Sequence, residues 1–540
     1  MSMPPISFDN GSSGQLFDGR LAAGRDGGQP KFWRWALRLG FWLGILLAVR
    51  LVALYFNTTD LFFDEAQYWS WSLQPAFGYY SKPPMIAWLI GLSTAVCGTS
   101  EFCVRLPSPL IHTVTAIAVF LVGARLYGAR VGFWCGVVFA TLPGVSFSAG
   151  LISTDVALLA FWAIALYGLV VLIEARGSWW PVLVLGCALG LGLNAKYAMA
   201  YFILCTLIYV FTTPEHRWLL RDRRWWGAVA IGAAMIVPNL IWNYQNSFAT
   251  FAHTADNAKW SGVLFHPNKA VEFFVAQFGV FGPVLFGALL VIAVRAYRQG
   301  LPGTDRFLLA FALPVVMIIT VQALLSRAHA NWAAVSYVAA SLLVTATMIR
   351  DGSWRWLGGA LALHLAVVGV LGIGLSQART LALPGGKNPF ARTLGWAELG
   401  RLTRRRLEYA RRTGQPYTSV VALGRSATAE LLYYMRDVDT PVLAWPAHGR
   451  PLDHYQLTRP FGGAGGRGAA GKPTTASGPV LLVAVRRIPS AVLQRFKVVG
   501  AIETVSVQTG AGARRSVYFV RLEGFRGLGR SKPTSRNEGR

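Results

Sequence analysis

The chain has 540 residues, of which 54% are hydrophobic and only 14% are charged. A soluble domain usually carries about 25% charged residues, so this composition excludes an ordinary soluble protein. The formal net charge is +27, which in a soluble protein would indicate nucleic-acid binding. Here many basic residues stand in short loops between apolar runs, where positive charge fixes membrane topology. We therefore expect membrane lipids, and no nucleic acid, around this chain.

Long apolar runs follow a polar N-terminal segment. Residues 1–34 contain many Gly and Ser and predict a disordered cytoplasmic tail. Runs of about 20 apolar residues match the hydrocarbon thickness of a bilayer, so the chain is predicted to be a polytopic α-helical membrane protein. About eleven spans are expected, near 36–56, 105–124, 131–149, 155–174, 180–194, 198–212, 226–243, 272–294, 307–325, 331–349 and 355–376.

The basic residues predict the orientation of these spans. With the N-terminus inside, every inner loop carries arginine, as at 125–130, 213–225 and 295–306. Residues 57–104, 244–271 and everything after about 377 then lie outside. The first outer loop, 57–104, contains short amphipathic stretches that predict helices in the membrane interface.

The composition of residues 385–525 is that of a soluble domain. Three segments read as strands (SVVALGR, PVLLVAVR and SVYFVRLEG) and two as helices (WAELGRLTRRRLEYARR and ATAELLYYMRD), which predicts a small extracytoplasmic α/β domain. Residues 462–478 predict a flexible insertion and 526–540 a disordered tail. The stretch GAGGRGAAGK approaches a phosphate-loop pattern, but its spacing is wrong, so no nucleotide site is expected. The basic stretch RLTRRRLEYARR faces anionic lipid, lipopolysaccharide phosphate or solvent.

The cysteines show no metal-ligand spacing, so neither a metal site nor another cofactor is expected. Cys97 and Cys103 either pair as a disulfide on the outer side or simply pack, and the others pack in apolar segments.

The first outer loop gathers unusual residues. It reads LFFDEAQYWSWSLQPAFGYYSKPPMIAWL, with Asp64 and Glu65 at an apolar boundary and Lys82 before two prolines. Acidic residues at such a boundary are costly and usually functional. The alternative is that Asp64 caps an interfacial helix and that the aromatic residues form an ordinary membrane belt. Capping alone leaves the combination with the lysine and the prolines unexplained.

Further candidates stand at predicted outer ends of spans. Asp155 begins the fourth span, where helix capping is the competing interpretation, and Lys196 lies between the fifth and sixth spans. His253 lies in the second outer segment. The stretch SRAHANW contains Arg327, His329 and Asn331, where an arginine on the outer side is unexpected.

Together these motifs resemble the GT-C glycosyltransferases of the bacterial protein-mannosyltransferase-like type. The run DEAQYWSW, YYSKPPMIAWL and EFCVRLPS carries the resemblance, with STDVALL, GLNAKY, HTADNA and RAHANW as further landmarks. Lipid A aminoarabinose transferase and rhizobial lipopolysaccharide galacturonosyltransferases look most similar. The resemblance covers about 35–350 and implies that 35–376 form a transmembrane catalytic domain.

The resemblance implies a polyprenyl-phosphate-linked sugar donor and a glycolipid acceptor at the periplasmic face of the bacterial inner membrane. It implies that Asp64 is the catalytic base and that Lys82 lies near the donor phosphate. The aminoarabinose transferase has an acidic residue before that lysine, which helps to hold a structural metal, whereas this chain has Ser81. This departure puts both a metal and an aminosugar in doubt.

The sequence thus predicts an inverting glycosyltransferase that modifies lipid A, lipopolysaccharide or another glycoconjugate. The catalytic group is expected to comprise Asp64, Glu65 and Asp155, and the phosphate contacts Lys82, Lys196 and Arg327. The residues expected to line the substrate site are Tyr68, Tyr79, Tyr80, His253, His329 and Asn331. A flippase or transporter of lipid-linked sugars, a protein O-mannosyltransferase and a non-catalytic binding protein remain the alternatives; the absence of internal repeats argues against a transporter.

Overall fold

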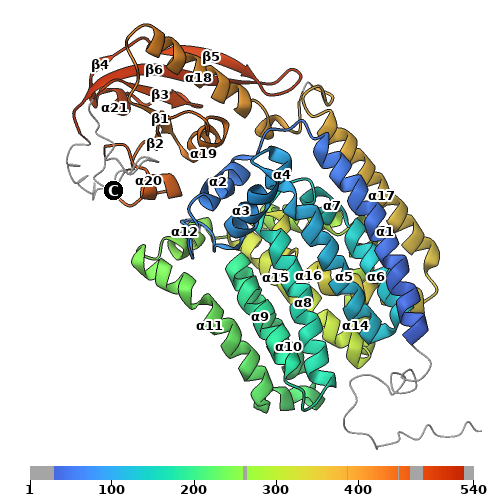
Figure 1. Ribbon diagram of the computed structural model, residues 1–540. Coiled ribbons are helices and arrows are strands. Elements are labelled where there is room, and N and C mark those ends of the chain that lie inside the picture. The colour runs from blue at the N-terminus through green and yellow to red at the C-terminus, as the bar shows by residue number, and fades with distance from the viewer. Residues whose placement is uncertain (1–28, 259–263, 386, 448, 463–477, 528–540) are drawn as a thin grey trace, which may run out of the picture.

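The computed structural model describes residues 29–258, 264–385, 387–447, 449–462 and 478–527. A bundle of helices carries at one end a small sheet domain (Figure 1). We call this end of the bundle the head end; it also holds the first loop, 57–104. The glycine-rich insertion and most of both predicted tails lie outside the described residues.

Within the described residues, six helical stretches are long and apolar enough to span a bilayer. They are α1 (Gln29–Tyr55), α4 with α5 (Glu101–Arg105 and Pro107–Tyr127), α8 (Thr154–Glu174), α11 (Arg223–Gln245), α15 (Gly303–Leu325) and α17 (Trp354–Ser376). All six coincide with predicted spans.

Shorter apolar helices fill most of the remaining predicted spans. They are α6 (Ala129–Thr141), α9 (Trp180–Ala195), α10 (Tyr201–Thr212) and α16 (Ser336–Arg350). Helix α16 is buried on all sides over most of its length, and α8 nearly so, which places both at the centre of the bundle. The number of eleven membrane spans stays a prediction. By length and composition, the described helices support six spans, or seven if one pair of helices joined at a bend counts as a span.

The expectation of a continuous span over 272–294 is wrong. Two helices, α13 (Pro267–Val280) and α14 (Pro283–Gln299), meet there at an angle of 116°. The break falls at Gly282, whose φ of +91° is left-handed and whose Cβ position would lie 2.4 Å from the His364 ring. Pro283 follows and has no backbone N–H to continue the helix.

The remaining short helices connect these elements. They are α2 (Phe63–Ser72), α3 (Met85–Cys97), α7 (Pro143–Ser148), η2 (Tyr197–Ala200), η3 (Pro214–Arg221), α12 (Ala249–Ala258), η4 (Ala330–Ala333) and η5 (Ala391–Thr393). Helices α2, α3 and α4 lie at the head end, beneath the sheet domain (Figure 1).

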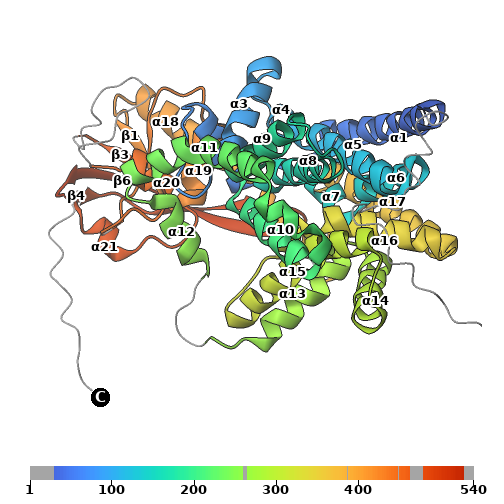
Figure 2. The same cartoon turned by 90° about the horizontal axis from the view of Figure 1, so that it is seen from below.

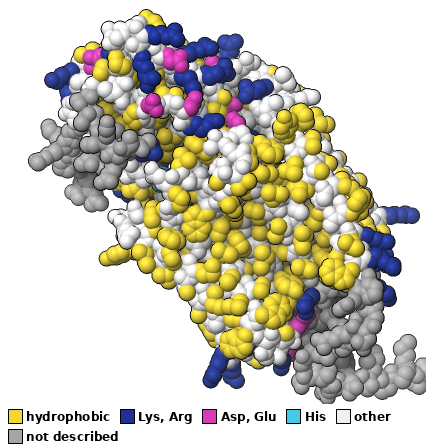
Figure 3. All heavy atoms as spheres, viewed as in Figure 1, with side chains coloured by type: hydrophobic (Ala, Val, Ile, Leu, Met, Phe, Trp, Pro, Cys, Tyr) yellow, Lys and Arg dark blue, Asp and Glu magenta, His cyan; other side chains and the backbone are white. Residues whose placement is uncertain are grey.

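The surface is divided by side-chain type. A broad apolar band covers the bundle, and Lys and Arg gather on the sheet domain and at the opposite end (Figure 3). Large apolar side chains such as Trp42, Leu183 and Val370 are exposed on this bundle. An apolar band between two charged ends fits a protein whose middle part lies in the hydrocarbon core of a bilayer.

The C-terminal part forms the predicted α/β domain. Within the described residues its sheet has six strands, with the order β2-β1-β3-β6-β4 and β5 also paired to β6. The strands are β1 (Ser419–Leu423), β2 (Val442–Ala444), β3 (Val480–Ala484), β4 (Phe496–Val499), β5 (Glu503–Gln508) and β6 (Arg514–Phe525). Strand β1 is parallel to β2 and β3, whereas β6 is antiparallel to its partners. Figure 2 shows this domain projecting from one end of the bundle.

In the part of this domain that the structure describes, four helices accompany the sheet: α18 (Trp396–Arg412), α19 (Arg425–Tyr434), α20 (His454–Thr458) and α21 (Ser490–Leu493). The three predicted strands correspond to β1, β3 and β6, and the two predicted helices to α18 and α19, so this part of the fold prediction is confirmed. The basic face of α18 forms ion pairs within its own domain, as between Arg404 and Asp437.

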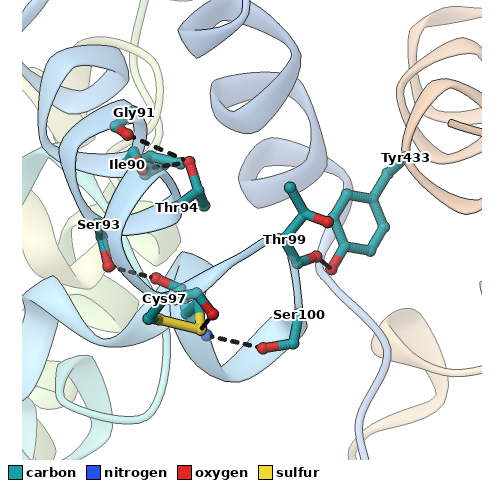
Figure 4. Close-up of a disulfide and its surroundings, with 9 residues drawn as sticks. Ile90, Gly91, Ser93, Thr94, Cys97, Thr99, Ser100 and Tyr433 are labelled. Atoms are coloured by element: carbon teal, nitrogen blue, oxygen red, sulfur yellow. Dashed lines mark hydrogen bonds between the residues drawn. A yellow bond between two sulfur atoms is a disulfide. The ribbon is translucent and has the colours of Figure 1, made fainter.

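The first loop holds the sheet domain in place through specific contacts. The Asp60 carboxylate accepts hydrogen bonds from the Trp396 and Ala397 N–H groups at 2.8 and 3.3 Å, and so caps the N-terminus of α18. The Tyr433 hydroxyl donates to the Thr99 carbonyl at 2.7 Å (Figure 4). The contacting residues lie far apart in sequence, so the sheet domain and the first loop form one structure.

Cys97 and Cys103 form a disulfide between the end of α3 and α4 (Figure 4). The sequence had left this pairing open. The bridge closes the short turn that carries Thr99 to Tyr433. The remaining cysteines are free, and two of them are fully buried in the bundle.

Candidate active site

Helix α2 carries the two adjacent carboxylates of the first loop. The residue before the helix is Phe62, and both Asp64 and Glu65 lie in its first turn, where negative charge is favoured. Asp64 is not the capping residue, so the capping interpretation is wrong for it. Glu65 instead accepts the Phe62 N–H at 2.8 Å, which satisfies one free donor of the helix start.

Glu65 is buried and forms an ion pair with Arg105. The guanidinium donates from Nε and Nη2 at 2.9 and 2.8 Å, and the Ile152 N–H donates to the same carboxylate at 3.0 Å. Arg105 also donates to the Thr59 and Asp60 carbonyls. With only 1% of Glu65 exposed, this carboxylate joins the loop to α4 and to the segment before α8, and it has no access to a substrate.

Asp64 points the other way, toward the sheet domain. Its carboxylate lies 2.9 Å from Nη1 of Arg425, and both side chains are about one-third exposed. Arg425 is the first residue of α19, which packs against α2. Its guanidinium also donates to Gln67 at 3.2 Å and lies 4.8 Å above the Phe63 ring. The sheet domain therefore supplies a cation to the most accessible carboxylate of the loop.

A tight turn presents Lys82 to the same region. The Tyr79 N–H donates to the Lys82 carbonyl at 3.1 Å, and the two prolines that follow lead into α3. Burial, and then the neighbouring Lys196, lower the pKa of Lys82 to about 8, while Asp155 and Asp64 oppose that shift. Lys82 thus lies among the predicted catalytic and phosphate-binding groups.

Ser81 is buried beside Gln67, whose amide donates to the Ser81 hydroxyl at 3.4 Å. Among the residues that the structure describes, no group of three or more His, Cys, Asp or Glu side chains is arranged to hold a metal ion.

Asp155 joins three elements. Its carboxylate accepts from Lys196 at 2.7 Å and from the Asn331 amide at 2.6 Å. Asp155 lies in the first turn of α8, Lys196 follows α9, and Asn331 lies in η4. The competing interpretation of Asp155 as a helix cap is therefore wrong, because its carboxylate connects the ends of separate helices.

Several cations surround this group. The pKa of His329 is lowered by burial and then by Arg327, Lys196, Arg392 and Lys82, which places these four charges around the imidazole. The Nε of Arg327 is buried and has no hydrogen-bond partner among the described residues. Lys196 is neutralised by Asp155, so the remaining cations form a positively charged site.

The predicted lining residues lie around the Lys82 turn. Tyr68 is buried, and burial followed by the charge of Asp64 raises its pKa. The Tyr80 ring lies 5.5 Å from the His253 ring, and its hydroxyl donates to Pro451 at 2.9 Å. His253 also contacts Asn257 at 2.9 Å. Burial and the charge of Lys82 lower the pKa of His253 to about 4, so its imidazole is neutral near pH 7.

Tyr79 has a different environment from Tyr80. Its hydroxyl hydrogen-bonds to the Trp71 and Gln74 carbonyls, and its ring stacks on Trp71 at 4.7 Å. It therefore supports the turn and faces a neighbouring cavity.

Sequence reasoning missed Arg425 and Arg392, which both come from the C-terminal part. One signal could have found Arg425: it follows the parallel strand β1 after a single glycine and begins a helix. Side chains at the carboxyl ends of parallel strands commonly bind ligands. The sequence offers no comparable signal for Arg392, which precedes α18 and lies 5.1 Å above the Phe62 ring.

Comparison with known proteins identifies the family to which this chain belongs. Residues 81–242 match the family described as dolichyl-phosphate-mannose-protein mannosyltransferase. The lipid A galacturonosyltransferase of Rhizobium johnstonii is 37% identical over 413 residues, which are 75% of this chain and 84% of the relative. The chain belongs to the GT-C family of membrane glycosyltransferases. It is accordingly an enzyme that transfers sugars.

Other relatives are more distant. The lipopolysaccharide core galacturonosyltransferase of Rhizobium johnstonii is 26% identical over 47% of this chain and 54% of its own length. An undecaprenyl phosphate-α-4-amino-4-deoxy-L-arabinose arabinosyl transferase of Pseudomonas fluorescens is 31% identical over 38% of this chain and 39% of its own. The crystal structure of ArnT from Cupriavidus metallidurans bound to undecaprenyl phosphate shares the fold of this GT-C enzyme, with a TM-score of 0.58 and 16% identity over 90% of this chain and 98% of that one.

Proposed function

We propose that this enzyme transfers a sugar from a polyprenyl-phosphate carrier to a hydroxyl group of lipid A or of the lipopolysaccharide core. The observation that carries the proposal is the convergence of Asp64, Lys82 and Asp155 at the head end, where Lys82 lies within the field of both carboxylates. The names of the relatives support it, since they include a lipid A galacturonosyltransferase and undecaprenyl-phosphate-dependent transferases.

Asp64 is the proposed base. It is the accessible carboxylate of the pair, whereas Glu65 is buried against Arg105. The acceptor hydroxyl gives its proton to Asp64 as its oxygen attacks the anomeric carbon, and the bond from that carbon to the phosphate oxygen breaks. The bonding electrons leave with polyprenyl phosphate. One displacement inverts the anomeric configuration, and a positioned base of this kind contributes about 10²–10⁴-fold.

The proposed phosphate contacts are Lys82, Lys196 and Arg327. Lys196 lies close enough to Lys82 to lower its pKa, and Arg327 carries a buried donor with no partner among the described residues. Cations held in this way stabilise the charge that builds on the departing phosphate. Asp155 and Asn331 hold Lys196 in position. Glu65 is proposed to hold the loop.

The proposed sugar is a hexuronate. A uronate adds a carboxylate to the charge of the donor phosphate, and Arg392 and Arg425 add cations beyond the predicted phosphate contacts. A cationic aminosugar would meet repulsion here. The name of the 37% identical relative points to the same sugar class.

The proposed location is the bacterial inner membrane, with the head end and the sheet domain in the periplasm. Basic inner loops support this orientation. The disulfide between Cys97 and Cys103 supports it as well, since disulfides persist in oxidising compartments.

The test is transfer by the purified enzyme in lipid nanodiscs. It is given polyprenyl phosphates that carry galacturonate, 4-amino-4-deoxyarabinose or mannose, together with lipid A, core oligosaccharide lipid or a serine-containing peptide. We expect release of polyprenyl phosphate and a glycosylated lipid only with the uronate donor and a lipid acceptor. Transfer of mannose to the peptide would instead support a protein O-mannosyltransferase. Movement of the intact donor across sealed vesicles without cleavage would support a flippase.

A further inference from the structure

A cavity separate from the Asp64 and Lys82 site lies between the first loop and the sheet domain. Its volume is about 280 Å³, and it lies at the end of α2, beside Ser70 and Trp71. Asp64 is six residues before Ser70, and this length of α-helix spans about 9 Å. Small-molecule sites usually measure about 300–1,000 Å³, so this cavity suits a single sugar unit and not a lipid chain.

Aromatic rings form the walls of this cavity. Trp71 and Tyr79 are stacked with ring centroids 4.7 Å apart and an interplanar angle of 1°. The His454 ring lies edge-on to them, at 5.4 and 5.7 Å. A Cβ at the buried Gly78 would lie 2.5 Å from the ring of Trp242, so only glycine lets this fourth ring close the wall. Trp71 and Tyr79 cover each other's faces and are only 1% and 2% exposed, so the stack forms a rigid apolar wall behind the cavity.

The polar atoms of the cavity lack protein partners. Trp71 Nε1 and His454 Nδ1 are buried and have no hydrogen-bond partner among the described residues. Buried polar atoms are nearly always satisfied, so two orphans in the lining of one cavity indicate a missing ligand or water. Burial lowers the pKa of His454 to about 3, so the imidazole is neutral and is available as a hydrogen-bonding group.

The cavity also holds an uncompensated cation. Arg459 lines it, and burial lowers the pKa of its guanidinium. No carboxylate among the described residues forms an ion pair with it, in contrast to Arg425 and Arg450. A partly buried guanidinium with no anion beside it favours an anionic ligand.

We propose that this cavity binds an anionic monosaccharide unit of the acceptor glycolipid, with the sugar beside the wall that Trp71 and Tyr79 form and its carboxylate or phosphate on Arg459. The turn from Tyr79 to Lys82 links the two sites, since Tyr79 forms one wall of the cavity and Lys82 lies at the donor site. The cavity selects an acceptor that already carries an acidic sugar near the hydroxyl to be modified. The acceptor identity rests on the proposed function; the binding of the sugar does not.

The test measures binding directly, by saturation-transfer difference NMR on the full-length enzyme in nanodiscs at constant ionic strength. The probes are galacturonate, glucose 1-phosphate, glucose and inorganic phosphate. We expect both anionic sugars to bind and glucose to bind at least tenfold more weakly. Arg459→Gln and His454→Phe should each lower the affinity for the anionic sugars about tenfold, the scale of one hydrogen bond to a charged group. Arg459→Lys should restore part of it, and the exposed Arg487→Gln should change nothing.

Three outcomes would overturn the proposal. Glucose that binds as tightly as galacturonate removes the role of the charge. Inorganic phosphate that displaces both anionic sugars and binds as tightly as they do removes the role of the ring. Binding that is lost in Lys82→Gln but kept in Arg459→Gln assigns the probes to the donor site. If binding behaves as expected but no transfer occurs with any donor, the cavity stands and the proposed function fails. In transfer assays, Arg459→Gln should raise KM for the acceptor about tenfold with little change in kcat.

Discussion

Asp64 and Glu65 are neighbours in the sequence but have opposite environments. Successive residues on an α-helix point about 100° apart, so one carboxylate of α2 faces the body of the bundle while the next faces the sheet domain. Glu65 is neutralised by Arg105 in a buried ion pair, and Asp64 remains one-third exposed beside Arg425. Accessibility, which the sequence does not report, separates a structural carboxylate from a candidate base.

Substituting each carboxylate by its amide should separate activity from stability. Asp64→Asn keeps the shape of the side chain but removes the proton acceptor, so we expect a 10²–10⁴-fold lower kcat with an unchanged melting temperature. Glu65→Gln leaves Arg105 without its buried counter-ion, which should destabilise the protein by about 3 kcal/mol. Transfer assays and thermal denaturation in detergent measure the two effects. Equal loss of activity at normal stability in Glu65→Gln would contradict these roles.

The pKa of Lys82 should appear in the pH dependence of transfer. This pKa is lowered to about 8, so the ammonium is present below that pH and is lost as the pH rises through it. We expect kcat/KM for the donor to fall above about pH 8, because the neutral amine no longer attracts the phosphate. Lys82→Arg should retain its charge and remove this fall, even at a lower maximum. Measuring kcat/KM from about pH 6.5 to 9.5 for the unmodified enzyme and for Lys82→Arg checks this prediction. The same fall above about pH 8 in both enzymes would refute it.

At the scale of elements, the contact between α2 and α19 is the feature that assembles the site. It brings Arg425 to Asp64 and also buries Glu430, whose two carboxylate oxygens have no hydrogen-bond partner among the described residues. Burial is the largest cause that raises the pKa of Glu430 far above its usual value, followed by the charges of Asp60 and Glu65. Arg515 and Arg105 oppose this shift. Burial at this interface thus favours the neutral form of the carboxyl group.

Glu430 should make this interface sensitive to alkali. Its folded-state pKa is raised, so its protonated form is compatible with folding, and stability is lost as the pH rises above the ordinary glutamate value. We expect Glu430→Gln to raise the melting temperature at pH 8 by about 3 °C or more and to change it little at pH 4.5. The exposed Glu408→Gln on α18 is the matched control. A destabilised Glu430→Gln at pH 8 would mean that the charged carboxylate is the native form.

At the scale of the whole molecule, the sheet domain takes part in the site. Ion pairs and hydrogen bonds join it to the first loop at several separate points, including Asp60 at the start of α18, Tyr433 at Thr99 and Tyr455 at Ser70. These contacts hold α19 and its first residue over the carboxylate of α2. The domain therefore supplies one charge of the candidate active site and part of the lining of the neighbouring cavity.

Removal of the Arg425 charge should impair catalysis without separating the domain. Arg425→Gln keeps a hydrogen-bonding group near Gln67 but leaves Asp64 without its cation, so we expect about tenfold lower kcat/KM for the uronate donor. The exposed Arg487→Gln on the same domain is the control and should behave as the unmodified enzyme. If the proposed uronate contact is correct, the loss should be smaller with a neutral sugar donor. An equal loss with both donors would restrict Arg425 to positioning Asp64.

The sequence by itself determined the membrane class, the position of most helices, the strands β1, β3 and β6 and the loop that holds the site. These features depend on composition, on run length and on local periodicity, which can be read within about 20 residues. It failed at 272–294, where Gly282 and Pro283 break an apolar run that is long enough to span, because hydropathy alone does not register the bend.

Only the tertiary structure decided which charges meet. Asp155 contacts Lys196 and Asn331 across 41 and 176 residues, and Arg425 reaches Gln67 across 358. No local pattern specifies such pairs, because they arise from the packing of helix ends and from the docking of one domain on a loop. The degree of burial then distinguishes carboxylates that look equivalent in the sequence, because Glu65 is buried whereas Asp64 stays accessible. Burial also lowers the pKa of Lys82.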